Sequence, residues 1–260
     1  MSGSRGASPV VYHAPMELDG RFERELEIAR EVQVRLFPRV VPQIERLDLA
    51  AACIQARAVG GDYYDFLDFG SRQFGFVLAD ISGKGIHAAL RMVGLQAHLR
   101  SQVINAPQDP LRVLRMVNQM LCESTDMGQF ATLFLGAYAP ASRRLTYINC
   151  GHNPPLLLRA DGSVDRLEAT ATVIGAFPKW DCALGRTPLG AGDLFVGYSD
   201  GLTEASKHEE QFGEERLIAT LRELSSLAPD RLVAALLERV QEFCGGAPAD
   251  DLTLLVARGK

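Results

Sequence analysis

The sequence has no apolar stretch of about 18 residues, the length that a membrane-spanning helix needs, so no membrane span is expected. It has no long run of Lys or Arg, and its net charge of -5 argues against sequence-independent binding to nucleic acid. The N-terminal segment MSGSRGASPVVYHAP lacks the apolar centre of a signal peptide. The 5 cysteines are odd in number, widely spaced and set among apolar residues, which favours reduced thiols over a disulfide framework. These absences together predict a cytoplasmic protein.

The composition is that of a globular chain. Of 260 residues, 47% are apolar and 23% are charged, which is enough apolar material for a sizeable core. Residues 1–16 are rich in Ser, Gly and Pro and are expected to be disordered. We expect an amphipathic linker or regulatory helix within residues 17–45 and one folded domain over residues 46–260.

The helix expected over residues 18–36 has apolar side chains at spacings of three and four and ends before Pro38. Its apolar stripe is narrow, and its flanks carry charges of both signs, as in a helix that pairs with another helix. Packing of the helix on its own domain explains the pattern equally well. The stripe consists of Leu18, Phe22, Leu26, Ala29, Val32 and Leu36.

The remaining pattern consists of two blocks of strands, each followed by two helices. In the first block, strands are expected at residues 47–56, 63–69 and 73–80, a hairpin turn at Gly70-Ser71-Arg72, and helices at residues 86–103 and 110–121. In the second, strands are expected at residues 130–139, 143–150, 154–160, 163–168, 171–174 and 194–199, a turn at Asp161-Gly162, helices at residues 214–224 and 229–243, and a strand at 251–257. Strands and helices do not alternate one by one, which argues against a parallel doubly wound sheet. The sequence predicts an α+β fold of two stacked, mostly antiparallel sheets flanked by helix pairs.

Four aspartates stand where apolar runs meet turn residues. Asp80 ends the run of residues 76–79, Asp62 follows two glycines, and Asp200 and Asp250 have similar settings. Taken singly, each is better explained as a cap or turn residue than as a metal ligand. Taken together, four carboxylates without a nearby histidine fit a hard cation such as Mg²⁺ or Mn²⁺, which would also offset their mutual repulsion. Two such ions, roughly 3.5–4 Å apart, activate a shared water for phosphoryl displacement.

Seven sequence blocks, in order, resemble the SpoIIE/RsbU-type bacterial branch of the PP2C-like, metal-dependent protein serine/threonine phosphatases. The resemblance covers residues 47–257 and implies a two-sheet αββα sandwich, two Mn²⁺ or Mg²⁺ ions, and hydrolysis of phosphoserine and phosphothreonine by a metal-activated water. The blocks are GGDYYDF, ADISGKGIHAAL, FATLFLGAY, GHNPPLLLR, GDLFVGYSDGLTEA, FGEERL and DDLTLLV.

The resemblance also implies a ligand set. Asp62 and Asp80 would bind one ion with the backbone carbonyl of Ile81, and Asp80, Asp200 and Asp250 would bind the other. Asp251 stands where many relatives carry Asn, so both residues of the Asp250-Asp251 pair remain candidates for the direct ligand.

The sequence departs from the family at positions that concern phosphate binding and the general acid. Arg57 and Lys84 are candidates for phosphate binding, although each is equally explained as a solvated residue at a strand edge or a turn. Eukaryotic relatives carry a histidine where this chain has Ser82. His87 is a minor candidate for the general acid, and we favour a solvent-facing position in the first helical turn for it.

Other enzyme classes fit less well. The match of residues 197–201 to G-x-S-x-G is not followed by the acid and then histidine of a serine hydrolase, because no histidine follows Asp250. Residues 82–85 lack the first glycine and the final Ser/Thr of a phosphate loop. Cys150 and His152 have no partner pair at zinc spacing, and His152 is expected to shape a turn.

The main rival is a catalytically weak scaffold that keeps the fold and binds a regulatory partner. The resemblance implies a phosphorylated anti-anti-sigma (STAS) protein as substrate, in partner-switching regulation of transcription. We expect control through the helix at residues 18–36, by an upstream activator docked on it or by homodimerisation.

Overall fold

The computed structural model describes residues 20–70, 73–124, 128–246 and 248–260. Two five-stranded antiparallel sheets form its centre. The first sheet has the order β2-β3-β4-β5-β8, with β2 (Tyr63–Asp68), β3 (Phe74–Ile81), β4 (Ala131–Ala139), β5 (Arg144–Cys150) and β8 (Gly185–Pro188). The second has the order β1-β12-β9-β6-β7, with β1 (Leu47–Ile54), β12 (Leu252–Gly259), β9 (Leu194–Tyr198), β6 (Leu156–Leu158) and β7 (Val164–Arg166).

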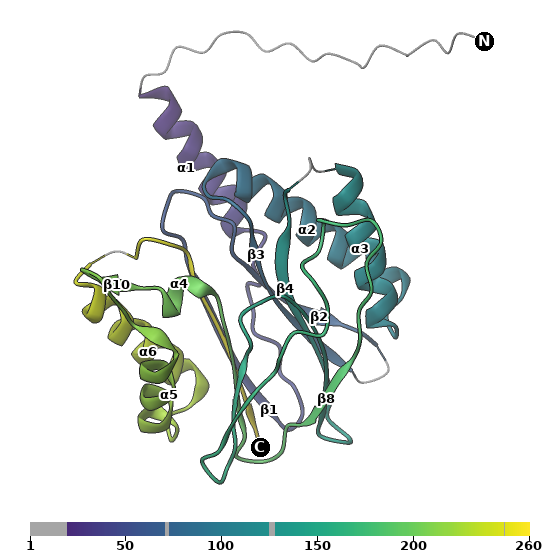
Figure 1. Ribbon diagram of the computed structural model, residues 1–260, viewed down its shortest axis with the longest axis vertical. Coiled ribbons are helices and arrows are strands. Elements are labelled where there is room, and N and C mark those ends of the chain that lie inside the picture. Colours follow the sequence, from purple (N-terminus) through teal and green to yellow (C-terminus); the bar gives the residue numbers. More distant parts are fainter. Residues whose placement is uncertain (1–19, 71–72, 125–127, 247) are drawn as a thin grey trace.

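The sheets stack face to face, and each outer face is covered by a pair of helices (Figure 1). The helices α2 (Ile86–Asn105) and α3 (Pro110–Ser124) cover the first sheet, and α5 (Gly213–Leu224) and α6 (Pro229–Cys244) cover the second. A third cluster of buried side chains, including Phe76, Phe134 and Phe195, fills the space between the sheets. This four-layer arrangement confirms the predicted α+β class.

Antiparallel pairing brings distant aspartates to one end of the sandwich. Tyr63 pairs with Ala79, so Asp62, just before β2, lies beside Asp80 near the end of β3. In the other sheet Leu254 pairs with Tyr198, which places the segment before β12 beside the segment after β9. Asp250 and Asp200 lie in those two segments.

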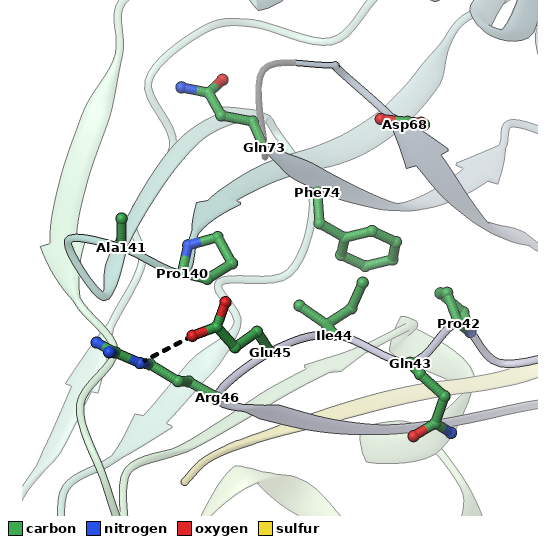
Figure 2. Close-up of a pocket in the computed structure, with 10 residues that line it drawn as sticks. All are labelled: Pro42, Gln43, Ile44, Glu45, Arg46, Asp68, Gln73, Phe74, Pro140 and Ala141. Carbon is green, nitrogen blue, oxygen red and sulfur yellow. Dashed lines mark ion pairs between the residues drawn. The ribbon is translucent and has the colours of Figure 1, made fainter.

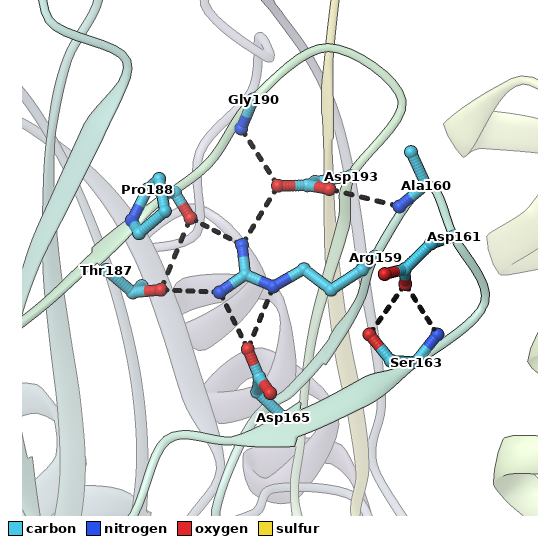
Figure 3. A network of polar contacts seen from close by, with 9 residues as sticks. All are labelled: Arg159, Ala160, Asp161, Ser163, Asp165, Thr187, Pro188, Gly190 and Asp193. Carbon is cyan, nitrogen blue, oxygen red and sulfur yellow. Dashed lines mark hydrogen bonds and ion pairs between the residues drawn. The ribbon is translucent and has the colours of Figure 1, made fainter.

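At the opposite end of the sandwich, Arg159, which follows β6, links the two sheets (Figure 3). Its guanidinium donates to Asp165 Oδ2 at 2.8 Å and to Asp193 Oδ2 at 2.9 Å in its own sheet. It also donates to Thr187 Oγ1 and to the Pro188 carbonyl, both at 2.8 Å, in β8 of the first sheet. One side chain therefore ties the two sheets together far from the aspartates.

The expected elements are present, with local differences. The strand expected at residues 171–174 is reduced to isolated bridges at Ala171 and Ile174, and β8 forms at residues that were not expected to pair. The short helix α4 (Asp200–Thr203) and the small hairpin β10 (Ser206–Lys207) and β11 (Glu210–Gln211) were not expected either, because runs of two to four residues carry no periodicity. Gly162 has φ 86°, as the predicted turn requires, whereas residues 71 and 72 of the first hairpin turn lie outside the described residues.

The expected N-terminal helix is present as α1 (Arg21–Val34), which projects from the sandwich in Figure 1. Residues 1–19, where disorder and the helix start were expected, lie outside the described residues. Most of its apolar stripe is exposed: Val32 is 53% exposed and Phe22 36%. None of the helices in the described part of the chain is long and apolar enough to cross a membrane.

Candidate metal centre

Asp62 is the most deeply buried of the predicted carboxylate ligands, with 2% of its surface exposed. Its carboxylate accepts a hydrogen bond of 2.6 Å from the Thr253 hydroxyl of β12. Burial, and then the neighbouring carboxylate of Asp80, raise the pKa of Asp62 well above its usual value, while the Thr253 hydroxyl acts in the opposite direction.

Asp80, Asp200 and Asp250 influence one another electrostatically. Burial, followed by the carboxylates of Asp200 and Asp250, raises the pKa of Asp80 to about 7. Burial and then Asp250 raise the pKa of Asp200. Asp62 is therefore influenced by Asp80, and Asp80 by Asp200 and Asp250, so the four carboxylates lie near one another at this end of the sandwich.

The donor set suits a hard divalent cation. It consists of carboxylate oxygens, to which the carbonyl of Ile81 at the end of β3 can be added, and these are the ligands that Mg²⁺ and Mn²⁺ prefer. Burial, and then neighbouring carboxylates, raise the pKa values of Asp62, Asp80 and Asp200, and a bound cation would oppose both effects. In the conformation described, no three His, Cys, Asp or Glu side chains within residues 20–70, 73–124, 128–246 and 248–260 converge closely enough to hold an ion.

Two cationic side chains lie beside these carboxylates. The Lys84 ammonium forms an ion pair with Asp250 Oδ2, and this hydrogen bond is the main cause of the raised pKa of Lys84. The Arg57 guanidinium lies near Gly85, since a Cβ atom at Gly85 would stand 3.6 Å from Arg57 Nη1. Both residues line a small crevice together with Asp80 and Asp250, so both predicted phosphate-binding residues lie at the site.

Asp251 points to the backbone of the loop before β2. Its Oδ1 accepts from the Ala56 amide at 2.8 Å, and its Oδ2 accepts from the amides of Gly61 at 2.9 Å and Asp62 at 3.4 Å. The adjacent carboxylates of Asp250 and Asp251 therefore have different surroundings.

Three polar residues considered in the sequence, Ser82, His87 and His152, have defined contacts. Ser82 joins the loop after β3 to Phe130, because its Oγ accepts from the Phe130 amide at 3.0 Å. His87 is exposed in the first turn of α2, as expected, with Nε2 3.0 Å from Arg91 Nη2. His152 is buried, its ring Nδ1 lies 2.9 Å from Thr132 Oγ1, and its amide donates to Asn149 at 2.8 Å, which supports the predicted role in shaping a turn.

Gln33 was missed by the sequence analysis. It is the one buried residue of α1, and its side-chain amide donates to the Gly60 carbonyl at 2.8 Å and accepts from the Gly60 amide at 3.1 Å. Gly60 is two residues before Asp62, so α1 is hydrogen-bonded directly to the loop that carries this predicted metal ligand. In a helix of charged residues, a single buried amide carries no periodic signal.

A cavity of about 690 Å³ lies elsewhere, at the other end of the β2–β3 hairpin (Figure 2). Its lining includes Ile44, Phe74 and Pro140, and an ion pair between Glu45 and Arg46 stands at its edge. The four aspartates are not among its lining residues.

Comparison with known proteins decides the family. Residues 70–260 match the family described as Stage II sporulation protein E (SpoIIE). The phosphoserine phosphatase RsbU of Bacillus subtilis (strain 168) is 31% identical over 245 residues, which cover 91% of this chain and 70% of RsbU. The chain belongs to the SpoIIE family, a branch of the PP2C-type serine/threonine phosphatases. It spans between 24% and 70% of the length of the five curated relatives compared.

Solved structures agree on the fold. The SiaA-PP2C domain of Pseudomonas aeruginosa superposes with a TM-score of 0.82 at 19% identity, covering 92% of this chain and 98% of that one. The catalytic domain of the serine threonine protein phosphatase PstP, solved in complex with 2 manganese ions, has a TM-score of 0.59 at 18% identity and covers 82% of this chain and 98% of that one. The sandwich inferred from strand order is therefore the PP2C-like fold.

Proposed function

We propose that this protein is a metal-dependent phosphatase that hydrolyses phosphoserine and phosphothreonine in proteins. The observation that supports the proposal is the strand pairing that brings Asp62, Asp80, Asp200 and Asp250 to one end of a PP2C-like sandwich. Burial, and then neighbouring carboxylates, raise the pKa values of Asp62, Asp80 and Asp200, as is common where carboxylates gather at a functional site.

Two divalent ions, Mn²⁺ or Mg²⁺, fit this donor set and, when bound, supply charge neutralisation and an activated water nucleophile. Asp62, Asp80 and the Ile81 carbonyl would hold one ion, and Asp80, Asp200 and Asp250 the other. The manganese-bound relative PstP supports the choice of metal. Because Asp80 would be a ligand of both ions, we expect binding of the two ions to depend most on Asp80.

Arg57 and Lys84 would bind the phosphoryl oxygens of the substrate. Lys84 pairs with Asp250 in the structure described, and its side chain is 51% exposed, so it can reorient toward an arriving phosphate. The Arg57 fork lies across the same crevice and can donate two parallel hydrogen bonds. His87 points to Arg91 and solvent, so we assign leaving-group protonation to water.

The substrate, partners and location are part of this proposal. We propose a phosphorylated anti-anti-sigma (STAS) protein as substrate, within partner-switching regulation, in the cytoplasm, where the 5 cysteines remain reduced. The exposed stripe of α1 would receive an upstream activator or a second copy of the chain. We assign residues 17–45 to regulation and residues 46–260 to the phosphatase domain.

The test is release of phosphate from a phosphoserine peptide and from p-nitrophenyl phosphate, with and without Mn²⁺. We expect Mn²⁺-dependent turnover that Asp80→Asn abolishes without loss of the folded state, measured by circular dichroism. A scaffold that binds a partner without turning it over is the second candidate. No Mn²⁺-dependent release from either substrate or from a phosphorylated STAS protein would favour that scaffold.

A further inference from the structure

The start of β12 holds the loop that carries Asp62 from two directions. Asp251 directly precedes β12 and Thr253 is the second residue of that strand. Asp251 accepts hydrogen bonds from the amides of Ala56, Gly61 and Asp62, and the Thr253 hydroxyl donates to the Asp62 carboxylate. Asp62 is thus fixed at its backbone and at its side chain by one short segment.

These contacts are buried and local. Asp251 is 9% exposed and Thr253 is 1% exposed, so water competes little for either. A carboxylate that accepts three backbone amides has few lone pairs left for a metal ion. Thr253 is fixed in turn, because its own amide donates to Ser199 Oγ at 2.9 Å, beside the segment that carries Asp200.

We propose that Asp251 and Thr253 are a positioning pair: neither ligates a metal, and together they set the position of Asp62 as a ligand. This inference rests on the proposed function and assigns Asp250, of the two adjacent aspartates, as the direct ligand. Residues that orient a metal ligand typically contribute about ten- to a hundredfold in metal affinity.

Binding of Mn²⁺ alone, measured by calorimetry on the full chain, tests the pair. Thr253→Val removes the hydroxyl, and we expect Mn²⁺ affinity to fall about tenfold or more while the number of bound ions stays that of the wild type. Thr253→Ser keeps the hydroxyl and should restore the affinity. Asp251→Asn should also weaken binding without lowering the number of ions, whereas Asp250→Asn should lower that number. Loss of an ion in Asp251→Asn, or wild-type affinity in Thr253→Val, overturns the inference.

Hydrogen exchange in EDTA tests Asp251 without metal. The amides of Ala56, Gly61 and Asp62 lie outside the strands, yet we expect slow exchange in the wild type and fast exchange in Asp251→Asn. If Asp251→Asn does not fold, exchange in the wild-type protein tests the inference instead. Fast exchange at all three amides would contradict the proposed role of Asp251. A wild type that binds no Mn²⁺ would defeat the proposed function, while the exchange result would still report on Asp251.

Discussion

Gln33 of α1 and Gly60 of the loop before β2 form a closed pair of hydrogen bonds, with Nε2 to O at 2.8 Å and N to Oε1 at 3.1 Å. The pair satisfies both backbone groups of Gly60 with a side chain 27 residues away. The C-terminal end of α1 is also fixed by Phe37, whose ring centroid lies 5.4 Å from that of Tyr64. A rotation or shift of α1 must therefore move or release the loop that carries Asp62.

Replacement of Gln33 tests this connection. Gln33→Ala leaves a buried amide and a buried carbonyl of Gly60 without their partner, at a cost of about 1–3 kcal/mol for each unsatisfied group. We expect Mn²⁺ affinity and turnover of p-nitrophenyl phosphate to fall about tenfold or more. Glu27→Gln, on the exposed part of the same helix, is the control and should behave as the wild type. Equal activity of the two variants would show that α1 does not act through Gly60.

Gly60 has no room for a side chain. A Cβ atom there would lie 1.7 Å from Gln55 Oε1 and 2.0 Å from Asp251 Oδ2. We therefore expect Gly60→Ala to displace the loop and to lower the melting temperature and the Mn²⁺-dependent activity together. Gly94→Ala in α2 is the matched control, since no atom lies within 4 Å of its added Cβ and alanine favours a helix by about 0.5–1 kcal/mol. An unchanged Gly60→Ala protein would contradict the tight packing of this loop.

The sequence singled out candidate metal ligands but not the residues that fix the loop beside them. Asp80 could be singled out because it ends an apolar run, which identifies a strand, and Asp62 because it follows two glycines in a block that resembles the family. The partners of the loop could not be found in this way. Gln33 and Asp251 are 27 and 190 residues from the glycines that they bind, and side-chain bonds to loop backbone leave no periodic pattern.

Asp65 of β2 is fully buried and depends on Arg100 of α2. The guanidinium donates to its two oxygens at 2.7 and 2.8 Å, and the Tyr63 hydroxyl donates to the same carboxylate. Arg100→Ala removes the only cation paired with Asp65 among the described residues, and removal of one partner of a buried pair is strongly destabilising. Because the Arg100 side chain is 48% exposed, we expect a loss of about 2 kcal/mol in unfolding free energy.

Urea denaturation in EDTA measures this loss without any contribution from metal binding. The control is Arg35→Ala, whose ion pair with Glu31 is 3.7 Å long and exposed on both sides. It should change the unfolding free energy by less than about 0.5 kcal/mol. If the two arginine variants are equally stable, Arg100 does not anchor α2 to β2.

We expect His152 to make the fold sensitive to acid. Burial lowers the pKa of His152 from 6.5 to about 4, while the Tyr198 backbone acts weakly in the opposite direction. Above pH 6.5 the imidazole is neutral in both the folded and the unfolded chain, so the full stability is present. As the pH falls from 6.5 toward 4, the unfolded chain takes up the proton first, and the folded state loses up to about 3 kcal/mol. We expect the unfolding free energy of the wild type to fall more steeply over this range than that of His152→Gln, which cannot be protonated. Parallel curves for the two proteins from urea titrations at pH 7, 6, 5 and 4 would show that His152 is not the group responsible.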